Sequence, residues 1–292
     1  MANLKEIRNR IVSVSSTQQI TSAMKMVSAA KLRRAQDAVT QMRPYANKLK
    51  EILENLSVSL DSSEGTYSKQ NEIKKVLLVV ITSNRGLCGG FNANVIKAAN
   101  RLIREEYNGK KVNVLCIGKK GADYFRKTDM MYIPSEMPKP LNELFDQLTF
   151  ANVAPVGEKI MELFVKGEFD RIDLVYNQFK NAAVQITTHE QYLPVQPPKA
   201  TVKTASVDYI FEPNKQYIVE DLIPRSLKTQ LFKALLDSLA AEHGARMTAM
   251  HKATDNAGAL IKELKLTYNK ARQAAITNEI LEIVGGAEAL NG

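Results

Sequence analysis

The segment whose composition most suggests chemistry is the glycine-rich stretch Arg85-Gly-Leu-Cys-Gly-Gly-Phe-Asn92. It follows an apolar, β-branched run at 76–82 and precedes an amphipathic pattern, which is where phosphate-binding loops lie in α/β proteins. Two details argue against a nucleotide site. Cys88 stands where the dinucleotide motif GxGxxG needs glycine, and no Lys-Ser/Thr pair follows the glycines as the phosphate loop requires.

We therefore favour a tight strand-to-helix turn in which Gly86, Gly89 and Gly90 serve backbone geometry, including positive φ. A nucleotide-using α/β enzyme is the alternative, and it predicts saturable nucleotide binding at residues 83–92. Cys88 has two interpretations as well: a reactive thiol near a helix N-terminus, or the more frequent small buried apolar group.

Other catalytic or ligand-binding patterns are missing from the sequence. The two cysteines, Cys88 and Cys116, form no CxxC pair, and the three histidines are scattered. No Ser-His-Asp, Cys-His or paired-carboxylate arrangement can be placed. We expect no catalytic residue, no metal and no cofactor in this chain.

Composition places the chain among folded proteins with no visible targeting or membrane-spanning segment. Its 292 residues are 45% apolar, enough for one large domain or two ordinary ones. The longest apolar run, Val76 to Ile81, is far too short to span a bilayer, and the N-terminus carries no apolar signal core.

The net charge of +9 is concentrated near the N-terminus, where residues 1–60 hold ten Lys/Arg against four Asp/Glu. This excess predicts an anionic neighbour: nucleic acid, a membrane surface or an acidic protein. A coiled-coil binder of nucleic acid is thus a second alternative, which predicts steeply salt-dependent DNA binding. However, no aromatic residue before Tyr45 is available to stack on bases.

The C-terminal stretch, from about Pro224 to Leu290, predicts a very long helix. Apolar and small residues recur in alternating steps of three and four, which is the spacing of a coiled-coil seam. The expected seam residues are Met250, Ala253, Ala257, Leu260, Leu264, Thr267, Ala271 and Ala274.

A second long helix is predicted from Ala2 to about Ser59, with Pro44 causing a local kink rather than an end. Its seam starts with Leu4, Ile7, Ile11 and Val14 and finishes with Ala46, Leu49, Leu53, Leu56 and Leu60. Between these sets the apolar residues Ile20, Met24 and Val27 change phase, so we expect the seam to rotate around the helix.

The middle of the chain predicts alternating strands and helices after a polar break at 61–66. A helix after Asn92 is expected to stop near Gly109, a short helix follows Gly121, and another is expected from Val156 to Lys166 after Pro155. The expected strands are 76–82, 112–117, 171–179, 183–192 and a last short one near 208–211.

The predicted fold class is α/β. Two long antiparallel coiled-coil helices, at 1–60 and 206–292, flank a small Rossmann-like and mostly parallel α/β domain at 61–205, which has an antiparallel edge. The helices must be antiparallel because the insert joins the end of one to the start of the other.

Three segments together resemble the gamma subunit family of the F-type ATP synthase, the central rotor stalk. The first comprises Ile7-Arg-Asn-Arg-Ile-Val-Ser-Val14 and Thr17-Gln-Gln-Ile-Thr-Ser-Ala-Met-Lys-Met-Val27. The second is Arg85-Gly-Leu-Cys-Gly-Gly90. The third comprises Ala245-Arg-Met-Thr-Ala-Met250, Ala253-Thr-Asp-Asn-Ala257 and the stretch from Tyr268 to Ala287. The resemblance covers both helices and, more loosely, the insert. Asn84 stands where many relatives carry Asp, and the cysteine-bearing insertion of plastid forms is missing near 194–206.

The resemblance implies a non-catalytic rotor that couples ion flow through the membrane ring of c subunits to ATP synthesis and hydrolysis on the beta subunits. The implied partners are the hexamer of alpha and beta subunits, the epsilon subunit and the c-ring, with the delta subunit reached only through the assembled complex. No nucleic acid or small-molecule substrate is implied. The implied location is peripheral, on the cytoplasmic face of a bacterial plasma membrane.

As a shaft, the chain needs stiff, smooth and only locally polar contact residues. We expect contacts with the hexamer at Arg8, Arg10, Met24, Lys25, Met26, Arg272, Gln273, Thr277, Glu279 and Glu282.

Overall fold

The computed structural model describes most of the chain at the level of backbone and side chains. The described residues are 4–58, 67–69, 72–134, 137, 140–195 and 215–291. The polar break at 61–66 and the short strand expected near 208–211 lie outside them. The domain boundaries expected at 60/61 and 205/206 fall outside them too, so these boundaries stay a prediction.

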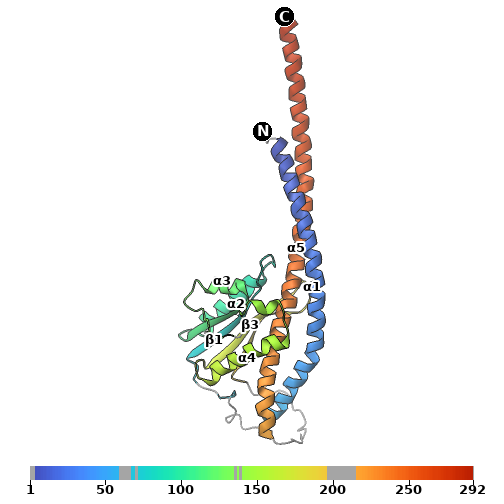
Figure 1. Cartoon of the computed structure of the whole chain (residues 1–292). Helices are drawn as coiled ribbons and strands as arrows, with labels where there is room; N and C mark the ends of the chain where they lie inside the picture. The colour runs from blue at the N-terminus through green and yellow to red at the C-terminus, as the bar shows by residue number, and fades with distance from the viewer. Residues whose placement is uncertain are drawn as a thin grey trace. The chain divides into compact units, whose positions relative to one another are not determined.

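Helix α1 runs unbroken from Leu4 to Val58 (Figure 1). Glycine is missing from this stretch and good helix formers dominate it. Pro44 lies inside the helix, as expected, because one missing N–H removes a single hydrogen bond while the neighbouring turns are retained.

The expected rotation of the α1 seam is wrong. Residues that are not exposed keep one unbroken alternation of four and three through the middle of the helix, at Gln18, Thr21, Lys25, Ser28 and Leu32, and Met24 is half-buried beside them. By contrast, Ile20 is 60% exposed and Val27 is 57% exposed. Polar residues can lie in this seam because their hydroxyl groups find partners: Ser28 Oγ, for example, donates to Met24 O at 2.7 Å.

Helix α5 spans Lys215–Asn291 and therefore begins before Pro224, not at it. Pro224 lies inside the helix, as Pro44 does in α1, and the residues before it are compatible with helical structure. The sequence interpretation treated this proline as a boundary, whereas it interrupts only one hydrogen bond.

The α5 seam also differs in detail from the expected one. Met250, Ala257 and Leu264 are buried as predicted. Further along, Thr267 and Ala274 are exposed, and Tyr268 and Ala275 take the less exposed positions. Both choices satisfy a seven-residue repeat, and only the partner helix decides which of two adjacent residues faces it.

The two helices are antiparallel. Thr21 Oγ1 and Thr254 Oγ1 lie 2.9 Å apart, and one turn further Gln18 Nε2 lies 3.0 Å from the point where a Cβ on Gly258 would be. The residue numbers fall on α1 as they rise on α5. Figure 1 shows the C-terminal end of α5 continuing past the N-terminal end of α1.

The contacts divide the chain into two compact units. One contains the paired helix ends, residues 1–28 and 247–292, and the other contains residues 29–246. The second unit therefore includes long parts of both helices together with the α/β insert. The first is called the shaft end below.

The insert is built on a four-stranded sheet in the order β2-β1-β3-β4. β1 (Lys75–Ile81), β2 (Lys111–Ile117) and β3 (Arg171–Phe179) are parallel, and β4 (Gln185–Leu193) is antiparallel to β3. This is the mostly parallel sheet with an antiparallel edge that the sequence predicts. Register pairs include Val79 with Leu115 and Val79 with Leu174.

Helices cover both faces of the sheet. α2 (Phe91–Glu105) and α3 (Lys119–Phe125) pack on one face, through Val95, Ala99 and Phe125. A 3-10 turn, η1 (Glu143–Phe145), leads to α4 (Phe150–Val165) on the other face. α4 starts earlier than predicted: Pro155 lies within it, and Thr149 caps its N-terminus by accepting a hydrogen bond from Asn152 N.

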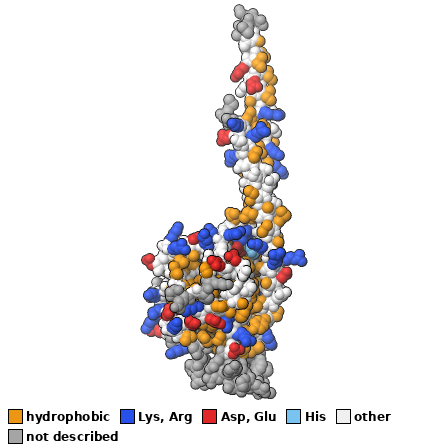
Figure 2. Space-filling view, viewed as in Figure 1, with side chains coloured by type: hydrophobic (Ala, Val, Ile, Leu, Met, Phe, Trp, Pro, Cys, Tyr) orange, Lys and Arg blue, Asp and Glu red, His pale blue; other side chains and the backbone are white. Residues whose placement is uncertain are grey.

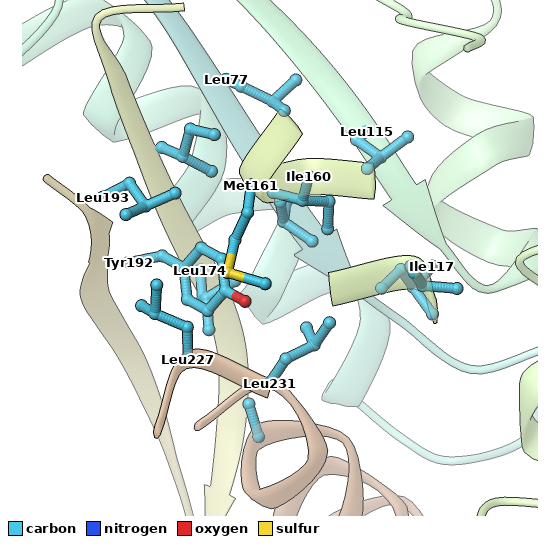
Figure 3. Packing of buried hydrophobic residues seen from close by; sticks show 14 of the residues in the cluster. Leu77, Leu115, Ile117, Ile160, Met161, Leu174, Tyr192, Leu193, Leu227 and Leu231 are labelled. Carbon is cyan, nitrogen blue, oxygen red and sulfur yellow. The ribbon is translucent and has the colours of Figure 1, made fainter. Parts of the chain in front are cut away.

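The second face is shared between α4 and α5. Leu227, Leu231, Ala234 and Leu235 of α5 belong to the same buried cluster as Leu77, Leu174 and Ile160. Figure 3 shows Leu227 directed toward Tyr192 and Leu231 directed from α5 into the middle of the cluster. The long helix is thus part of the core of the insert, and all its residues from Leu227 to Ala241 are buried or half-buried.

Candidate functional site: the carboxyl edge of the sheet and the shaft end

The glycine-rich turn follows β1 at the carboxyl edge of the sheet, where open α/β folds hold their ligands. The first residues of the turn are held by hydrogen bonds with side chains of the same segment. Asn92 Oδ1 accepts a hydrogen bond from Ser83 N at 2.9 Å, and Ser83 Oγ donates to Arg85 O at 2.7 Å. The turn is therefore held by its own polar groups.

Only one of the three turn glycines uses the left-handed region. Gly89 has φ of 59°, whereas the helix-capping Gly90 has φ of −77°, and Gly86 is not among the positive-φ residues. The other left-handed residue is Leu87, with φ of 62° and a side chain that is 64% exposed. The sequence interpretation missed Leu87, because composition does not identify a non-glycine residue in this conformation.

Cys88 is a buried side chain at 2% exposure. Its Sγ lies 3.2 Å from Asn92 Nδ2, which donates to it, and 3.7 Å from Ser83 Oγ. This placement fits the small buried group and not an accessible reactive thiol.

Helix α5 contacts this turn through Arg246. The Arg246 Nη1 donates to Glu242 Oε1 at 2.6 Å, and its Nη2 donates to Arg85 O at 3.1 Å and Gly86 O at 3.2 Å. Arg246 and Glu242 are each only 8% exposed. Burial raises the pKa of Glu242, and the Arg246 charge opposes that rise.

The neighbouring residues of α5 are buried at the same edge. Burial, with the nearby charges of Arg246 and Lys31, lowers the pKa of His243 to about 4. Gly244 lies against the β3–β4 hairpin: a Cβ at this position would be 3.1 Å from Ala182 O. Earlier on α5, the buried Asp237 pairs with Arg43 of α1 at 3.4 Å, and Arg43 also donates to Phe179 O at 3.2 Å.

The sequence analysis did not identify these α5 residues. The signal that could have found them is a glycine flanked by acidic and basic residues inside a predicted helix, since a helix-interior glycine costs stability unless something approaches closely.

A second polar cluster, on the opposite edge of the insert, fits an ion-pair network better than a metal. Ligand atoms of Glu106, Asp173 and His189 lie within 4.8 Å of one another. However, both Asp173 oxygens are already engaged: Arg171 donates to them at 3.1 and 3.2 Å, and His189 Nε2 lies 2.9 Å from Oδ2. Tyr107 also donates to Asp173, and burial raises the Tyr107 pKa. An arginine among the carboxylates supplies the positive charge that a metal would bring.

The expected hexamer contacts all lie in the shaft end, in two groups. Met24 and Lys25 are half-buried beside the Thr21–Thr254 pair, and Met26 is 65% exposed. Arg8 and Arg10 are exposed near the start of α1. The exposed residues Arg272, Gln273, Thr277, Glu279 and Glu282 lie on α5 at or beyond the level where α1 begins.

These two groups are separated along the axis. The Thr21–Thr254 pairing puts Met24 near residue 251, so Arg272 lies about 30 Å away along α5, at roughly 1.5 Å per residue. The structure therefore does not bring the methionine patch and the Arg272–Glu282 group together.

Apolar side chains are exposed on the surface of the shaft end. On α1 they are Val12, Ile20, Met26 and Val27, and on α5 they are Leu266, Ile276, Ile280, Leu281, Ile283 and Val284. Figure 2 shows apolar side chains, in orange, at intervals along the paired helices. Among the residues that the structure describes, Arg8 and Arg272 form no ion pair with a carboxylate. Exposed apolar surface next to unpaired charge is typical of a protein-binding surface.

Among the described helices, none contains a stretch that is both apolar enough and long enough to cross a bilayer.

Together, the antiparallel helix pair and the inserted α/β domain define a class of proteins in which two long terminal helices pair and carry an α/β insertion between them. Residues 3–290 match the family model described as ATP synthase. The chain is 64% identical to the ATP synthase gamma chain of Flavobacterium johnsoniae over 293 residues, covering 100% of both chains. It is 54% identical to that of Cytophaga hutchinsonii, again over 100% of both.

Solved structures agree on the fold. A chain of the Euglena gracilis mitochondrial ATP synthase, from a structure of OSCP, F1 and the c-ring, superposes with a TM-score of 0.65 at 23% identity, covering 98% of this chain and 94% of that one. A chain from the rotor of the same enzyme has a TM-score of 0.62 at 22% identity, with 94% and 98% covered. The chain belongs to the ATP synthase gamma chain family.

Proposed function

We propose that this chain couples ion flow through a c-ring to ATP synthesis and hydrolysis by rotating inside a hexamer of alpha and beta subunits. The chemistry takes place on the beta subunits, and this chain contributes no catalytic residue. The observation that supports the proposal is the surface of the shaft end, where two paired helices leave apolar side chains and unpaired charges exposed. An assembly would bury these exposed apolar side chains, whereas a chain that leaves them in water is less soluble.

The coupling works through unequal contacts. A pair of helices has no threefold symmetry, so at any moment it touches each surrounding catalytic subunit differently. Each subunit then occupies a different conformation, because the shaft interacts differently with its open and closed states and shifts their populations. Rotation moves these contacts around the ring of subunits and changes nucleotide affinity in sequence.

The contact residues are assigned by their place on the shaft end and by their chemistry. Met24, Lys25 and Met26 form a smooth, adaptable patch, and Arg8 and Arg10 add positive charge for acidic loops of the hexamer. Arg272, Gln273, Thr277, Glu279 and Glu282 make the polar contacts beyond the start of α1.

The insert carries the remaining partners of the proposal. Residues 61–205 bind the epsilon subunit and the c-ring, and the delta subunit is reached only through the assembled complex. The chain is then peripheral, on the cytoplasmic face of a bacterial plasma membrane.

Single-molecule rotation tests the proposal. The chain is assembled with alpha and beta subunits that are fixed to a surface, and a bead is attached at a cysteine replacing the exposed Lys127. We expect ATP-driven rotation in one direction that stops when ATP is removed. ATP hydrolysis by the same complexes without rotation of the bead, or failure of the chain to assemble with alpha and beta subunits, contradicts the proposal.

A further inference from the structure

The rotor function does not explain what lies at the carboxyl edge of the sheet, where related folds hold a ligand. In doubly wound α/β folds the ligand lies outside the carboxyl ends of the strands, at the point where the order of the strands reverses. Here that point lies between β1 and β3, since β1 pairs with β2 on one side and with β3 on the other. The segments that follow these two strands are the glycine-rich turn and the β3–β4 hairpin.

Both segments contact the same short piece of α5. On the β1 side, Arg246 donates to the carbonyl oxygens of Arg85 and Gly86. On the β3 side, the position of a Cβ on Gly244 would be 3.1 Å from Ala182 O and 3.5 Å from Phe179 Cε2. Glu242 Oε1 accepts from Arg246 at 2.6 Å and directs its guanidinium toward the turn.

We propose that residues 242–246 of α5 occupy the crevice where a Rossmann-like fold would hold its ligand, and that Arg246 is the positioning residue that fixes the insert to the shaft helix. The name clasp is used below for Glu242, Gly244 and Arg246 with their partners Arg85, Gly86 and Ala182. The proposal rests on the rotor function for its consequence, but its geometry is independent of that function.

The chemistry of the clasp suits a mechanical link. The planar guanidinium of Arg246 offers several donors in fixed directions, so it can hold a carboxylate and two carbonyl oxygens at once. Hydrogen bonds from a charged donor in a buried place are stronger than neutral ones. A glycine at 244 lets the helix backbone approach the hairpin more closely than any side chain would permit.

The clasp also lies between α5 and the insert, so torque that passes from one to the other passes through it. The apolar contacts of Leu227, Leu231 and Leu235 with the sheet are non-directional and resist sliding only weakly. Directional bonds between α5 and the turn set the rotation of the helix about its own axis relative to the sheet. Without them, α5 can rotate about its own axis against the sheet, so part of its rotation is not transmitted to the insert.

The first measurement uses the isolated chain. Backbone amide exchange at residues 84–92 is compared with exchange in β1 for Arg246→Gln, Arg246→Lys and the matched control Arg225→Gln. Arg225 lies on the same helix but is exposed, and its ion-pair partner among the described residues is Asp221. We expect exchange in the turn to accelerate about tenfold in Arg246→Gln, less in Arg246→Lys, and not at all in the control, with β1 unchanged.

A second variant distinguishes loss of the hydrogen bonds between α5 and the turn from a general loss of folding stability. Arg246→Gln leaves Glu242 buried without its partner, which by itself destabilises the fold. The double variant Glu242→Leu with Arg246→Met removes both charges and fills similar volume, a change that is often neutral for stability. We expect it to melt as the wild type does and still to show fast exchange in the turn.

The second measurement uses the assembled, membrane-reconstituted complex. ATP hydrolysis and ATP-driven ion pumping are compared for the double variant and for Arg225→Gln. We expect the double variant to hydrolyse ATP at the wild-type rate and to pump about half as many ions per ATP or fewer, whereas the control is unchanged.

Each outcome of the exchange and pumping measurements tests a different part of the proposal. Unchanged exchange at 84–92 in Arg246→Gln overturns the clasp. Faster exchange with normal pumping per ATP in the double variant overturns the positioning role, because the bonds then only stabilise the turn. If the wild-type chain fails to assemble with ATPase subunits, the rotor function fails instead, and the exchange data still decide whether the clasp exists.

Discussion

Thr21 of α1 and Thr254 of α5 hydrogen-bond to each other across the helix seam, with their hydroxyl oxygens 2.9 Å apart. Because each hydroxyl has one proton, one threonine donates across the seam while the other donates to its own helix, where Thr21 Oγ1 lies 3.0 Å from Gln18 O and Thr254 Oγ1 lies 2.8 Å from Met250 O. A polar pair inside a seam specifies register, because sliding by one turn would separate the two hydroxyl groups from each other. The pair therefore fixes the alignment of the shaft end.

This alignment predicts a specific crosslink. Thr21→Cys combined with Thr254→Cys should form a disulfide readily on mild oxidation, since the two side chains face each other directly. The control is Ile20→Cys with Thr254→Cys, because Ile20 is 60% exposed and lies on another face of the helix. Gel mobility of the oxidised chains reports the result. Equal crosslinking of both pairs would show that the register is wrong.

Charges placed on the shaft end should affect coupling more than folding. We expect Met24→Lys, Arg272→Glu and Glu279→Lys each to lower the number of ions pumped per ATP in reconstituted complexes, while changing the stability of the chain by only about 1 kcal/mol or less. Arg126→Glu, at an exposed position after α3, is the matched control. If pumping per ATP stays normal and only the amount of assembled complex falls, these residues are structural.

The glycine-rich turn should bind no nucleotide. Its polar groups hydrogen-bond to each other, and Arg246 donates to the carbonyl oxygens of Arg85 and Gly86. Calorimetry of the isolated chain with ATP, ADP and NAD should show no binding tighter than about millimolar, which corresponds to about 4 kcal/mol. Micromolar binding that is lost in Gly89→Ala would instead support the nucleotide-enzyme alternative.

The buried His243 should make stability depend on pH. Its pKa is lowered to about 4 in the folded chain, so between pH 4 and its ordinary value of 6.5 the unfolded chain binds the extra proton. Stability from this group is complete above about pH 6.5 and is lost as the pH falls toward 4, by about 2 kcal/mol. The raised pKa of Glu242 acts in the opposite sense.

The comparison that isolates His243 is the difference between the wild type and His243→Gln. We expect urea unfolding at pH 5 and pH 7.5 to show a smaller pH effect in His243→Gln than in the wild type. His251→Gln, at an exposed position of the same helix, should keep the wild-type difference. An identical pH dependence in all three chains contradicts the assignment.

Two glycines inside α5 should respond to alanine in opposite ways. At Gly258 the nearest atom is the flexible end of Gln18, at 3.0 Å, so Gly258→Ala should be tolerated and gain up to about 1 kcal/mol from helix propensity. At Gly244 the nearest atoms are backbone, Ala182 O at 3.1 Å and Ala182 Cα at 3.2 Å. Gly244→Ala should therefore destabilise by about 1–3 kcal/mol in urea unfolding. Equal effects at the two positions would show that α5 does not approach the hairpin closely.

The sequence by itself determined the elements and their order. Steps of three and four identify both long helices, and β-branched runs locate β1, β2, β3 and β4 to within two residues. These patterns are local, because hydrophobic periodicity records which side of an element turns away from water. Prolines were the exception: Pro155 and Pro224 were interpreted as helix boundaries, yet both lie inside helices whose packing outweighs one missing hydrogen bond.

The tertiary structure alone decided which partner each face meets. Ile20 and Val27 are exposed while Thr21 and Ser28 are in the seam, because a hydroxyl group is satisfied there by a threonine on the other helix or by a backbone carbonyl. Likewise, Arg246 shows its role only once α5 is packed against the insert, 160 residues from the carbonyl of Gly86 in the chain. The spacing of residues along one element carries no information about a contact at that separation, since such contacts depend on how the elements pack together.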